Sequence, residues 1–522
     1  MRIIALVACT LALASPAPAQ ERVFFGNLHS HTAKSDGSST PTRAYNHARN
    51  NARIQFLMLS EHNHNDNLSC AIADDPVLYS DAGDVTSSVG AANRANIDGT
   101  FVALYGQEFS THSAGNHVNV FDIPNVIPTA MNGDFAALLD WLARPENRDS
   151  SNRVALIQFN HPWAESSTDD EEYGHDDFSP VSEWVRRMDE VTELIEVVNG
   201  PAKNAGTNLR PANIEPAHYR QYLNLGFHLG PTANQDNHRQ NWGNSTTART
   251  GVITTELSKA GIMNALRARH VFATTDMNLE VIGRVNGALM GDVVDPGQMP
   301  VGTELNVTVS ILDRGEEGDP QPPHYRVRVF SDDGPGGDEA TVVAIHDAAG
   351  AANVPVQLVI PEVIYLGVGQ YLFLEVHQFS HAESVSSSAS DKVWTAPVWF
   401  ERPAAPVGPV VAPAGPRIVS LVPNSASPEG QTEEIMIHNG GTQAVSLAGW
   451  TVRDTTGATW SLSSLGSVAP GATVTIRRNG QAMSLNNTGD TVSLVNAGGL
   501  EIQVVTYGSA TEGEVVQVTG NP

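Results

Sequence analysis

Residues 27–37 read NLHSHTAKSDG and directly follow the apolar run RVFFG at residues 22–26. The apolar run predicts a strand, and on an extended segment His29 and His31 point to the same side, so both imidazoles can reach one ion. Asp36 lies further along the loop, where its carboxylate can serve a neighbouring ion. An isolated His-x-His is about as often a surface or packing feature as a ligand pair. The meaning of this stretch therefore depends on the strands that follow it.

Polar side chains also stand at the ends of most later apolar runs. These strand-end residues are Glu61, His62, Glu108, His117, Asn160, His161, Asp236 and His238. In folds built from β–α units the carboxyl ends of the strands converge on one rim, where active sites lie. Histidine and carboxylate ligands together suit zinc, manganese or iron. The series therefore predicts one polynuclear site for two or three divalent ions.

Residues 20–280 alternate β-rich runs with amphipathic stretches, which predicts repeated β–α units in a mainly parallel sheet or barrel. The expected strands are RVFFGNL, QFLMLS, FVALYGQEF, VALIQFN, ELIEVVN, FHLGPTA and GVITT. The expected helices are TPTRAYNHARNNA, FAALLDWLARP, SPVSEWVRRMDEV and KAGIMNALRARH. This half of the chain is thus predicted to be an α/β domain.

From residue 22 to residue 280 the chain resembles the polymerase and histidinol phosphatase (PHP) superfamily, and within it the secreted hydrolases termed CehA/McbA-like. The resemblance rests on the ordered series NLHSHTAKSDG, SEHN, GQEFS, HVNV, NHP and TANQDNHRQNWG. It implies a distorted (βα)7 barrel with up to three metal ions. It implies a first ion held by His29, His31, Glu108 and Asp236. It also implies a second ion held by His117, His161 and the bridging Glu108, and a third held by Asp36, His62 and His238.

Three positions need separate comment. Many relatives have Asp-His where this chain has Glu61-His62, so Glu61 either orients its neighbour or ligates an ion itself. His112 is an alternative ligand to His117, which we prefer because it directly enters an expected strand. Arg249 precedes a strand in TTARTGV, and it either steadies a phosphoryl oxygen or leaving group or forms a surface salt bridge.

The pattern changes near residue 281 to strands separated by Gly, Pro and Asp turns, which predicts an immunoglobulin-sized β-sandwich over residues 281–402. Residues 403–416, PAAPVGPVVAPAGP, predict an extended, semi-rigid linker. Residues 417–522 carry EEIMIHN, LAGWTVRDTTGATW, LGSVAPGATVTI and NNTGDTVSLVNAGG, and they resemble the lamin-tail domain, a second immunoglobulin-like sandwich. Trp450 is the expected core anchor of that domain. The predicted fold is therefore multidomain, an α/β barrel followed by two all-β sandwiches.

Residues 1–19 predict a secretory signal peptide, with Arg2, the apolar run IIALVACTLALA and a cleavage site after Ala19. The mature protein is then expected to be secreted or periplasmic, with Cys70 as its single cysteine and no intramolecular disulfide. No other apolar run approaches the roughly 18 to 20 residues that a bilayer span requires. The formal charge of −27, from 57 acidic and 30 basic residues, disfavours tight, extended nucleic-acid binding.

Together these features predict a secreted metal-dependent phosphoesterase acting on a small phosphomonoester or phosphodiester, a class that includes nucleotide-like substrates. Ions that share a carboxylate can ionise a bridging water to the attacking hydroxide. Glu108 and Asp236 are predicted to be catalytic through their place among these ions. The same centre suits hydrolysis of a carboxyl ester or carbamate, and a third hypothesis is a non-catalytic, surface-attached binding protein. The two sandwiches are the expected place of any contact with a polymer or cell surface.

Overall fold

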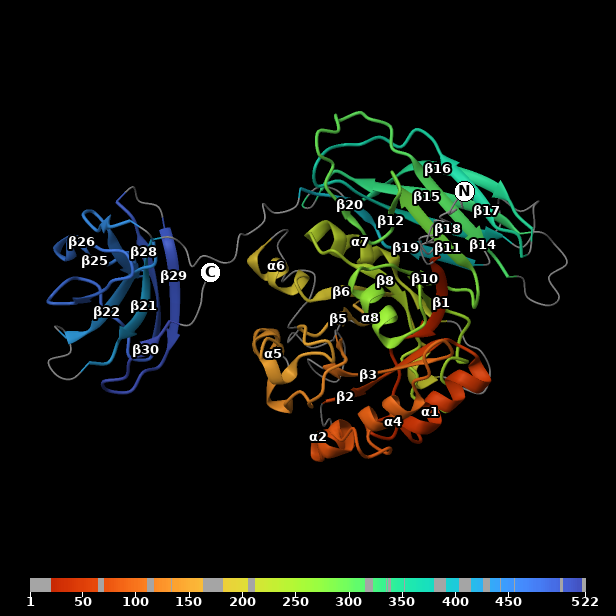
Figure 1. The fold of residues 1–522 in the computed structure, drawn as a ribbon, viewed down its shortest axis with the longest axis horizontal. Helices are drawn as coiled ribbons and strands as arrows, with labels where there is room; N and C mark the ends of the chain where they lie inside the picture. The colour runs from red at the N-terminus through yellow and green to blue at the C-terminus, as the bar shows by residue number, and fades with distance from the viewer. Residues whose placement is uncertain are drawn as a thin grey trace, which may run out of the picture. The chain divides into compact units, whose positions relative to one another are not determined.

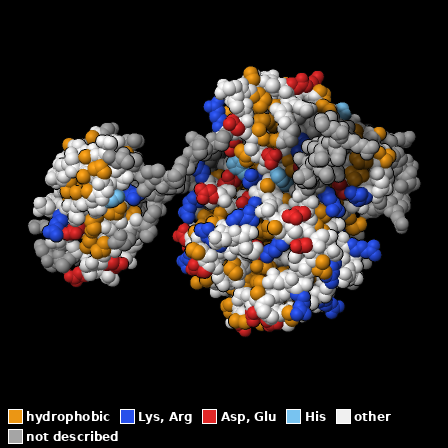
Figure 2. All heavy atoms as spheres, viewed as in Figure 1, with side chains coloured by type: hydrophobic (Ala, Val, Ile, Leu, Met, Phe, Trp, Pro, Cys, Tyr) orange, Lys and Arg blue, Asp and Glu red, His pale blue; other side chains and the backbone are white. Residues whose placement is uncertain are grey.

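The protein, seen here in a computed structural model, forms two compact units, one ending at Pro403 and the other beginning at Ala404. The structure describes residues 20–518 except 64–69, 110–116, 133, 163–181, 205–211, 315–322, 335, 337–338, 352, 380–390, 403–414, 426–431, 442, 455 and 498–500. The expected signal peptide and most of the expected linker lie outside the described residues. Within the described part, no helix is long and apolar enough to span a bilayer. On the face drawn in Figure 2, acidic and basic side chains of the first unit are interspersed.

The first unit is organised around a mixed sheet of 16 strands, and its N-terminal strands and helices alternate along the chain as the sequence predicts (Figure 1). The strands of this part are β1 (Arg22–Asn27), β2 (Phe56–His62), β3 (Val102–Phe109), β4 (Val118–Phe121), β5 (Ile157–Phe159), β6 (Thr192–Asn199), β7 (Asn213–Ile214), β8 (Gly230–Ala233), β9 (Arg249–Thr254) and β10 (Val271–Thr274). The helices are α1 (Pro41–His47), η1 (Ala48–Ala52), α2 (Ala71–Asp74), α3 (Val77–Ser80), α4 (Ser88–Ala95), η2 (Thr129–Met131), α5 (Phe135–Leu142), η3 (Pro145–Asn147), α6 (Glu183–Asp189), η5 (Ala202–Asn204), α7 (Pro216–Leu225) and α8 (Lys259–Arg267).

Local sequence signals explain where these helices begin. The Thr40 side chain accepts a hydrogen bond from the backbone N–H of Arg43, and Pro41 occupies the first helical position of α1. Ser258 caps α8 in the same way by accepting from the N–H of Gly261. Hydroxyl caps satisfy N–H groups that have no partner within the helix, and proline is already suited to the first helical turn. The caps therefore fix the point at which the chain turns back from strand to helix.

The sheet is mixed rather than mainly parallel. Parallel pairing joins β1 to β2, β2 to β3, β5 to β6 and β6 to β8, whereas β3–β4, β4–β5, β1–β9 and β9–β10 are antiparallel. The strand path also returns towards its start, because the Thr250 hydroxyl of β9 donates to the Ala233 carbonyl of β8 at 3.0 Å. Gly230 permits β8 to lie equally close to β10, since a Cβ there would lie 2.5 Å from the Val271 side chain. The result is a curved mixed sheet with antiparallel members that helix–strand periodicity does not reveal.

The strands of the expected first sandwich lie in two sheets. They are β11 (Glu280–Val285), β12 (Ala288–Leu289), β13 (Val293–Val294), β14 (Val307–Leu312), β15 (His324–Asp332), β16 (Thr341–Ala349), β17 (Val356–Ile360), β18 (Tyr371–Phe379), β19 (Asp391–Thr395) and β20 (Val398–Phe400). Of these, β13, β15, β16, β18, β19 and β20 belong to the 16-stranded sheet, and β12-β11-β14-β17 form a separate four-stranded sheet. β19 pairs with β10, with Phe272 opposite Thr395, and Phe25 and Phe272 share one apolar core with Val309 and Leu374. The expected boundary at residue 280 thus marks a change of pattern but no break between compact units.

A half-buried histidine links the two parts of this unit. His228, just before β8, contacts Asp189 Oδ2 through Nδ1 at 2.7 Å and Glu401 Oε1 through Nε2 at 3.0 Å. Burial by itself would lower the pKa of His228, but the hydrogen bonds and charges of Asp189 and Glu401 outweigh it and raise the pKa to about 9. Asp189 ends α6 and Glu401 follows β20, so a protonated His228 links the α/β part to the β-rich part.

Replacing His228 by Gln is expected to destabilise the first unit in a pH-dependent way. A folded-state pKa above the ordinary value of 6.5 stabilises the protein fully below pH 6.5 and loses that contribution as the pH rises through about 9. We expect urea unfolding to show a loss of about 2 kcal/mol near pH 6, the usual scale for hydrogen bonds to charged groups, and a much smaller loss at pH 10. A loss of equal size at both pH values would contradict the assignment of the raised pKa.

The second unit forms its own antiparallel β-structure. Its strands are β21 (Pro416–Val422), β22 (Glu434–Asn439), β23 (Val445–Ser446), β24 (Thr451–Asp454), β25 (Thr459–Ser461), β26 (Ser467–Val468), β27 (Thr473–Arg477), β28 (Gly489–Val495), β29 (Glu501–Gly508) and β30 (Val516–Gln517), with the short helix η6 (Ser463–Leu465). Two four-stranded sheets, β27-β22-β21-β30 and β25-β24-β28-β29, enclose one apolar core. The fully buried tryptophan is Trp460, which donates to the Met483 carbonyl at 2.7 Å, whereas the expected anchor Trp450 is only partly buried against that core.

Candidate metal centre

His29 and His31 follow the end of β1 and are both fully buried. Their rings lie 5.2 Å apart between centroids. A backbone bridge joins Ser30 to Asn237, and the His31 N–H donates to the Asn237 carbonyl at 2.9 Å. This pairing holds the segment after β1 alongside the loop that carries Asp236. The first motif is therefore brought to a second, distant one by backbone hydrogen bonding.

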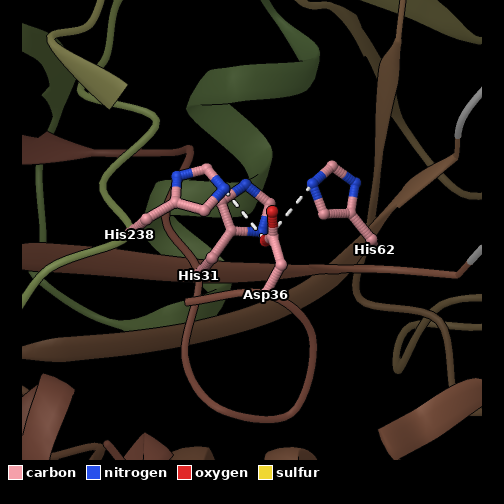
Figure 3. A group of neighbouring side chains, drawn as sticks. All are labelled: His31, Asp36, His62 and His238. Carbon is pink, nitrogen blue, oxygen red and sulfur yellow. Dashed lines mark ion pairs between the residues drawn. The ribbon is translucent and has the colours of Figure 1, made fainter. Parts of the chain in front are cut away.

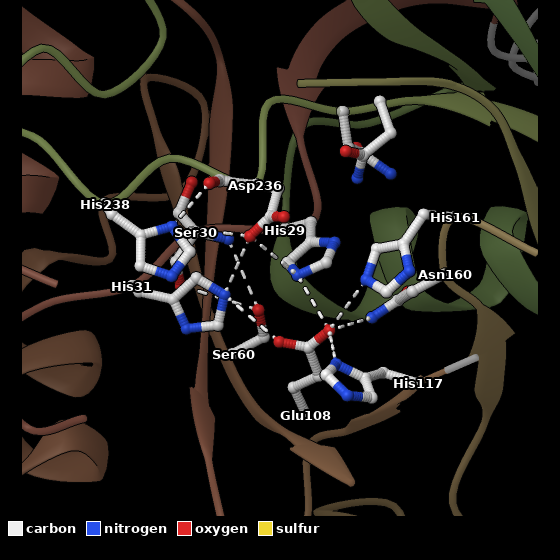
Figure 4. Close-up of polar contacts among 12 residues, drawn as sticks. His29, Ser30, His31, Ser60, Glu108, His117, Asn160, His161, Asp236 and His238 are labelled. Atoms are coloured by element: carbon white, nitrogen blue, oxygen red, sulfur yellow. Dashed lines mark hydrogen bonds and ion pairs between the residues drawn. The ribbon is translucent and has the colours of Figure 1, made fainter. Parts of the chain in front are cut away.

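Two carboxylates face this histidine pair (Figure 4). Glu108 Oε1 lies 3.2 Å from His29 Nε2, and Glu108 Oε2 lies 3.2 Å from His31 Nε2. Asp236 Oδ1 lies 3.3 Å and 3.1 Å from the same two nitrogens. The four ligand atoms lie within 4.8 Å of one another. These are the four residues that the PHP resemblance implies for the first ion.

A second group shares His31 with the first and adds Asp36, His62 and His238 (Figure 3). Asp36 Oδ1 lies 2.9 Å from His238 Nε2 and 3.6 Å from His62 Nε2. The loop that carries Asp36 folds back on the chain where the Gly37 N–H donates to the Thr32 carbonyl at 3.0 Å. A Cβ at Gly37 would lie 2.6 Å from the His31 carbonyl carbon, so the glycine permits this close turn.

A third group contains Glu108, His62 and His117. His117 Nδ1 lies 3.0 Å from Glu108 Oε1, and His62 Nδ1 lies 3.2 Å from Glu108 Oε2. The implied mapping instead pairs His117 with His161, whose Nε2 lies 3.3 Å from Glu108 Oε1 beside this group. The strand register explains why His62, rather than His161, belongs to this group: Glu108 of β3 pairs directly with His62 of β2. The alternative ligand His112 lies outside the described residues.

The buried polar atoms of these groups test whether a cation fits. His29 Nε2, His31 Nε2, His238 Nε2, Asp36 Oδ1 and Glu108 Oε2 are buried and have no hydrogen-bond partner within the described part of the chain. Buried polar atoms normally have a partner, and leaving one without a partner costs about 1 to 3 kcal/mol. The atoms without a hydrogen-bond partner here are imidazole nitrogens and carboxylate oxygens, and they lie close together. This donor set fits divalent cations such as zinc, manganese or iron.

The electrostatics of the cluster favour positive charge. Burial by itself would raise the pKa of Glu108, but His29, His62 and His117 hold that pKa well below the usual range. The pKa values of Asp36 and Asp236 are also lowered against burial, chiefly by His238 and His29 respectively. Burial disfavours a charged His31, yet the neighbouring carboxylates of Asp236 and Glu108 raise its pKa to about 10. The ionised carboxylates stabilise a positive charge on a neighbouring histidine, and their negative potential would stabilise a bound metal ion in the same way.

Glu61, for which the sequence leaves two roles open, lies outside these three groups. Its buried carboxylate accepts hydrogen bonds from Thr32 N–H at 3.1 Å, from the Thr32 hydroxyl at 2.5 Å and from the Ser35 hydroxyl at 2.6 Å. Those donors belong to the loop that leads to Asp36. Glu61 therefore positions that loop.

Arg249, predicted to act on substrate, is not brought to the cluster. Its buried guanidinium donates through one nitrogen to the carbonyls of Thr246 and Ala248, each at 2.7 Å, and burial lowers the pKa of Arg249 to about 10. Among the described ion pairs, none joins it to a cluster carboxylate. The residue stabilises its own loop, because a buried guanidinium needs nearby acceptors.

Burial raises the pKa of the Cys70 thiol to about 11, which argues against a thiolate nucleophile.

Glu196 is the residue of this centre that sequence reasoning missed. Its fully buried carboxylate lies 2.9 Å from His29 Nδ1, and it accepts from His161 N–H at 2.8 Å and from the Asn234 amide at 3.1 Å. Such a contact fixes the histidine tautomer and leaves Nε2 facing the cluster. A glutamate inside the otherwise apolar strand ELIEVVN is the signal that could have found it.

Replacing Glu196 by Gln is expected to weaken metal binding about 10- to 100-fold, the usual effect of losing an outer partner of a ligating histidine. Turnover at saturating metal should change far less, because the ligands themselves remain. Metal titration of the purified full chain, followed by elemental analysis and by activity, measures both quantities. The exposed Glu256 changed to Gln is the matched control. Unchanged metal affinity in the Glu196 variant would show that His29 needs no such support.

Comparison with known proteins gives one family match and several distant structural likenesses. Residues 411–509 match the lamin tail domain family, which confirms the resemblance found in the C-terminal segment. A two-domain protein from Bacteroides vulgatus, described as containing a predicted PHP-like metal-dependent phosphoesterase, is 14% identical over 72% of this chain and 96% of its own, with a TM-score of 0.35. An amidohydrolase from Chromobacterium violaceum with bound sulfate and no metal is 14% identical over 47% of this chain and 96% of its own, with a TM-score of 0.23. The chain matches no curated protein sequence.

Proposed function

We propose that the first unit is a metal-dependent phosphoesterase that acts on small phosphate esters. The observation that carries the proposal is the convergence of His29, His31, His238, Asp36 and Glu108, whose buried ligand atoms lack hydrogen-bond partners among the described residues. Three overlapping groups with shared members suit neighbouring ions rather than one. Divalent ions held there supply a water acidic enough to ionise near neutral pH and neutralise charge on a phosphoryl group.

The residues of the chain have distinct tasks in this proposal. Glu108 belongs to two of the three groups and receives a hydrogen bond from the Asn160 amide at 3.1 Å, so it would be a ligand shared by neighbouring ions. The Nδ1 of His238 contacts the Asp236 carbonyl at 2.7 Å, which directs Nε2 towards Asp36. Asp236 and His161 are each 14% exposed in their side chains and form the edge of the cluster that solvent reaches. Substrate is expected to enter at this edge.

A panel of three ester classes tests the proposal. The full chain, loaded with Mn²⁺ or Zn²⁺, would be assayed with 4-nitrophenyl phosphate, bis(4-nitrophenyl) phosphate and a naphthyl carbamate. Turnover of a phosphate ester that depends on added metal is the expected result. Turnover of the carbamate alone would instead assign the same centre to carboxyl-ester or carbamate chemistry. A purified protein that binds no metal would favour a binding protein and overturn the proposal.

The proposal also places the enzyme outside the cytoplasm. The support is residues 1–19, which have the charged start, apolar middle and small-residue cleavage site of a signal peptide. N-terminal sequencing of protein recovered from the medium or periplasm should begin at Gln20. The lamin tail unit is then available for contact with a surface or polymer.

A further inference from the structure

An exposed lysine contacts the metal cluster at Asp36. Lys203 lies in η5, directly after the end of β6. Its segment is tied to the loop of Asp236 by two hydrogen bonds: the Ala202 N–H donates to the Gln235 carbonyl at 3.1 Å, and Arg239 Nε donates to the Lys203 carbonyl at 3.2 Å. The backbone of Lys203 is therefore fixed relative to the cluster.

The side chain of Lys203 reaches the cluster from solvent. Its Nζ lies 2.5 Å from Asp36 Oδ2, while the other oxygen, Oδ1, faces His238 and His62. The Lys203 side chain is 57% exposed, whereas Asp36 is 9% exposed. Among the described ion pairs, this is the one that joins a lysine or arginine to a carboxylate of the cluster. An ammonium thus stands between the buried ligands and the solvent.

The positive charge of Lys203 suits an anionic substrate better than a neutral one. Two or three divalent ions can already neutralise the charges of Asp36, Glu108 and Asp236. The positive charge of Lys203 is therefore not needed to balance the site when the substrate is a neutral carboxyl ester. A phosphodiester carries one negative charge, whereas a phosphomonoester carries up to two near neutral pH. A lysine on a flexible stem is a point charge well suited to a phosphoryl oxygen. The second charge of a monoester is the group that such a lysine can recognise.

We propose that Lys203 is a specificity-determining residue that binds the terminal phosphoryl oxygens of a phosphomonoester, so that the enzyme prefers monoesters to diesters. The inference rests on the proposed phosphoesterase function and narrows it to one substrate class. The ammonium moves from Asp36 Oδ2 to the substrate when the anion enters. No bond is made or broken by Lys203.

Steady-state kinetics of the metal-loaded full chain test the inference with Lys203→Gln, Lys203→Arg and the control Lys34→Gln. Lys34 is half-buried and lies two residues before Asp36, with no ion pair described for its side chain. In Lys203→Gln we expect the KM for 4-nitrophenyl phosphate to rise about tenfold, as for loss of one charge-assisted hydrogen bond. We expect kcat, metal content and the KM for bis(4-nitrophenyl) phosphate to stay within about twofold, on the same scale. Lys203→Arg should restore part of the effect, and Lys34→Gln should behave as wild type.

Calorimetry with inorganic phosphate separates this inference from the proposed function. If wild-type protein hydrolyses no phosphate ester, the proposed function fails, but phosphate binding can still be measured. Binding that weakens about tenfold in Lys203→Gln supports the role of Lys203, and binding that is unchanged overturns it. Loss of metal, or an equal fall in kcat for both esters, would also overturn it, because either result means that Lys203 acts only by holding Asp36.

Discussion

Replacing Glu108 by Gln is expected to abolish hydrolysis and to lower the bound metal content. The change keeps the shape of the side chain but removes the charge that faces His29, His31, His62 and His117 at 3.0 to 3.2 Å. A metal centre contributes several kcal/mol to stabilising the transition state. A loss of about 4 kcal/mol corresponds to a rate reduced about 1000-fold.

The measurement combines kcat/KM for the best substrate of the ester panel with elemental analysis of the same sample. Glu256→Gln makes the same chemical change at an exposed position and should leave both quantities unaltered. Circular dichroism would show that the variant is folded. A Glu108→Gln protein with full activity would mean that the reaction centre lies elsewhere.

Removing metal with a chelator is expected to destabilise the first unit and leave the second unchanged. The cluster joins β1, β2, β3 and the loop after β8, so bound ions stabilise the folded state of that unit alone. At a metal concentration 1,000 times the dissociation constant, binding stabilises by about 4.1 kcal/mol. The lamin tail unit has its own core around Trp460 and should unfold independently.

Calorimetry of the full chain with and without chelator measures this difference, with two transitions expected and only one displaced. Glu108→Gln provides the matched control, since its transition should respond much less to the chelator. If the chelator moves neither transition while elemental analysis finds no metal, the assignment of a metal centre fails.

The sequence predicted much of this architecture because the signals were local. Each expected strand from RVFFGNL to GVITT contains or overlaps a strand of the structure, and the expected helices around Tyr45, Trp141 and Leu266 are present. His29, His31, Glu108 and Asp236 meet because strand ends converge. These features depend on periodicity and on strand ends, which short segments encode.

Features that depend on long-range pairing were not predictable. The segment GVITT does not indicate that β9 runs antiparallel to β1. The residues near 280 do not indicate that β10 pairs with β19. The grouping of His62 with Glu108 follows from the β2–β3 register, which is a relation between segments 46 residues apart in sequence, from 62 to 108. Trp460 rather than Trp450 became the buried tryptophan for the same reason, because packing between sheets decides burial.

The pairing of β10 with β19 also determines which segment of the chain can be transferred to another protein as a unit. A chain cut after residue 280 would leave β10 with a bare edge and Phe272 without its partners, and such an edge recruits other chains into aggregates. If recombination transfers the part of the chain that contains the metal cluster, residues 20–402 must therefore be transferred together. The lamin tail, by contrast, has its own apolar core, so a cut in the proline-rich segment divides neither core.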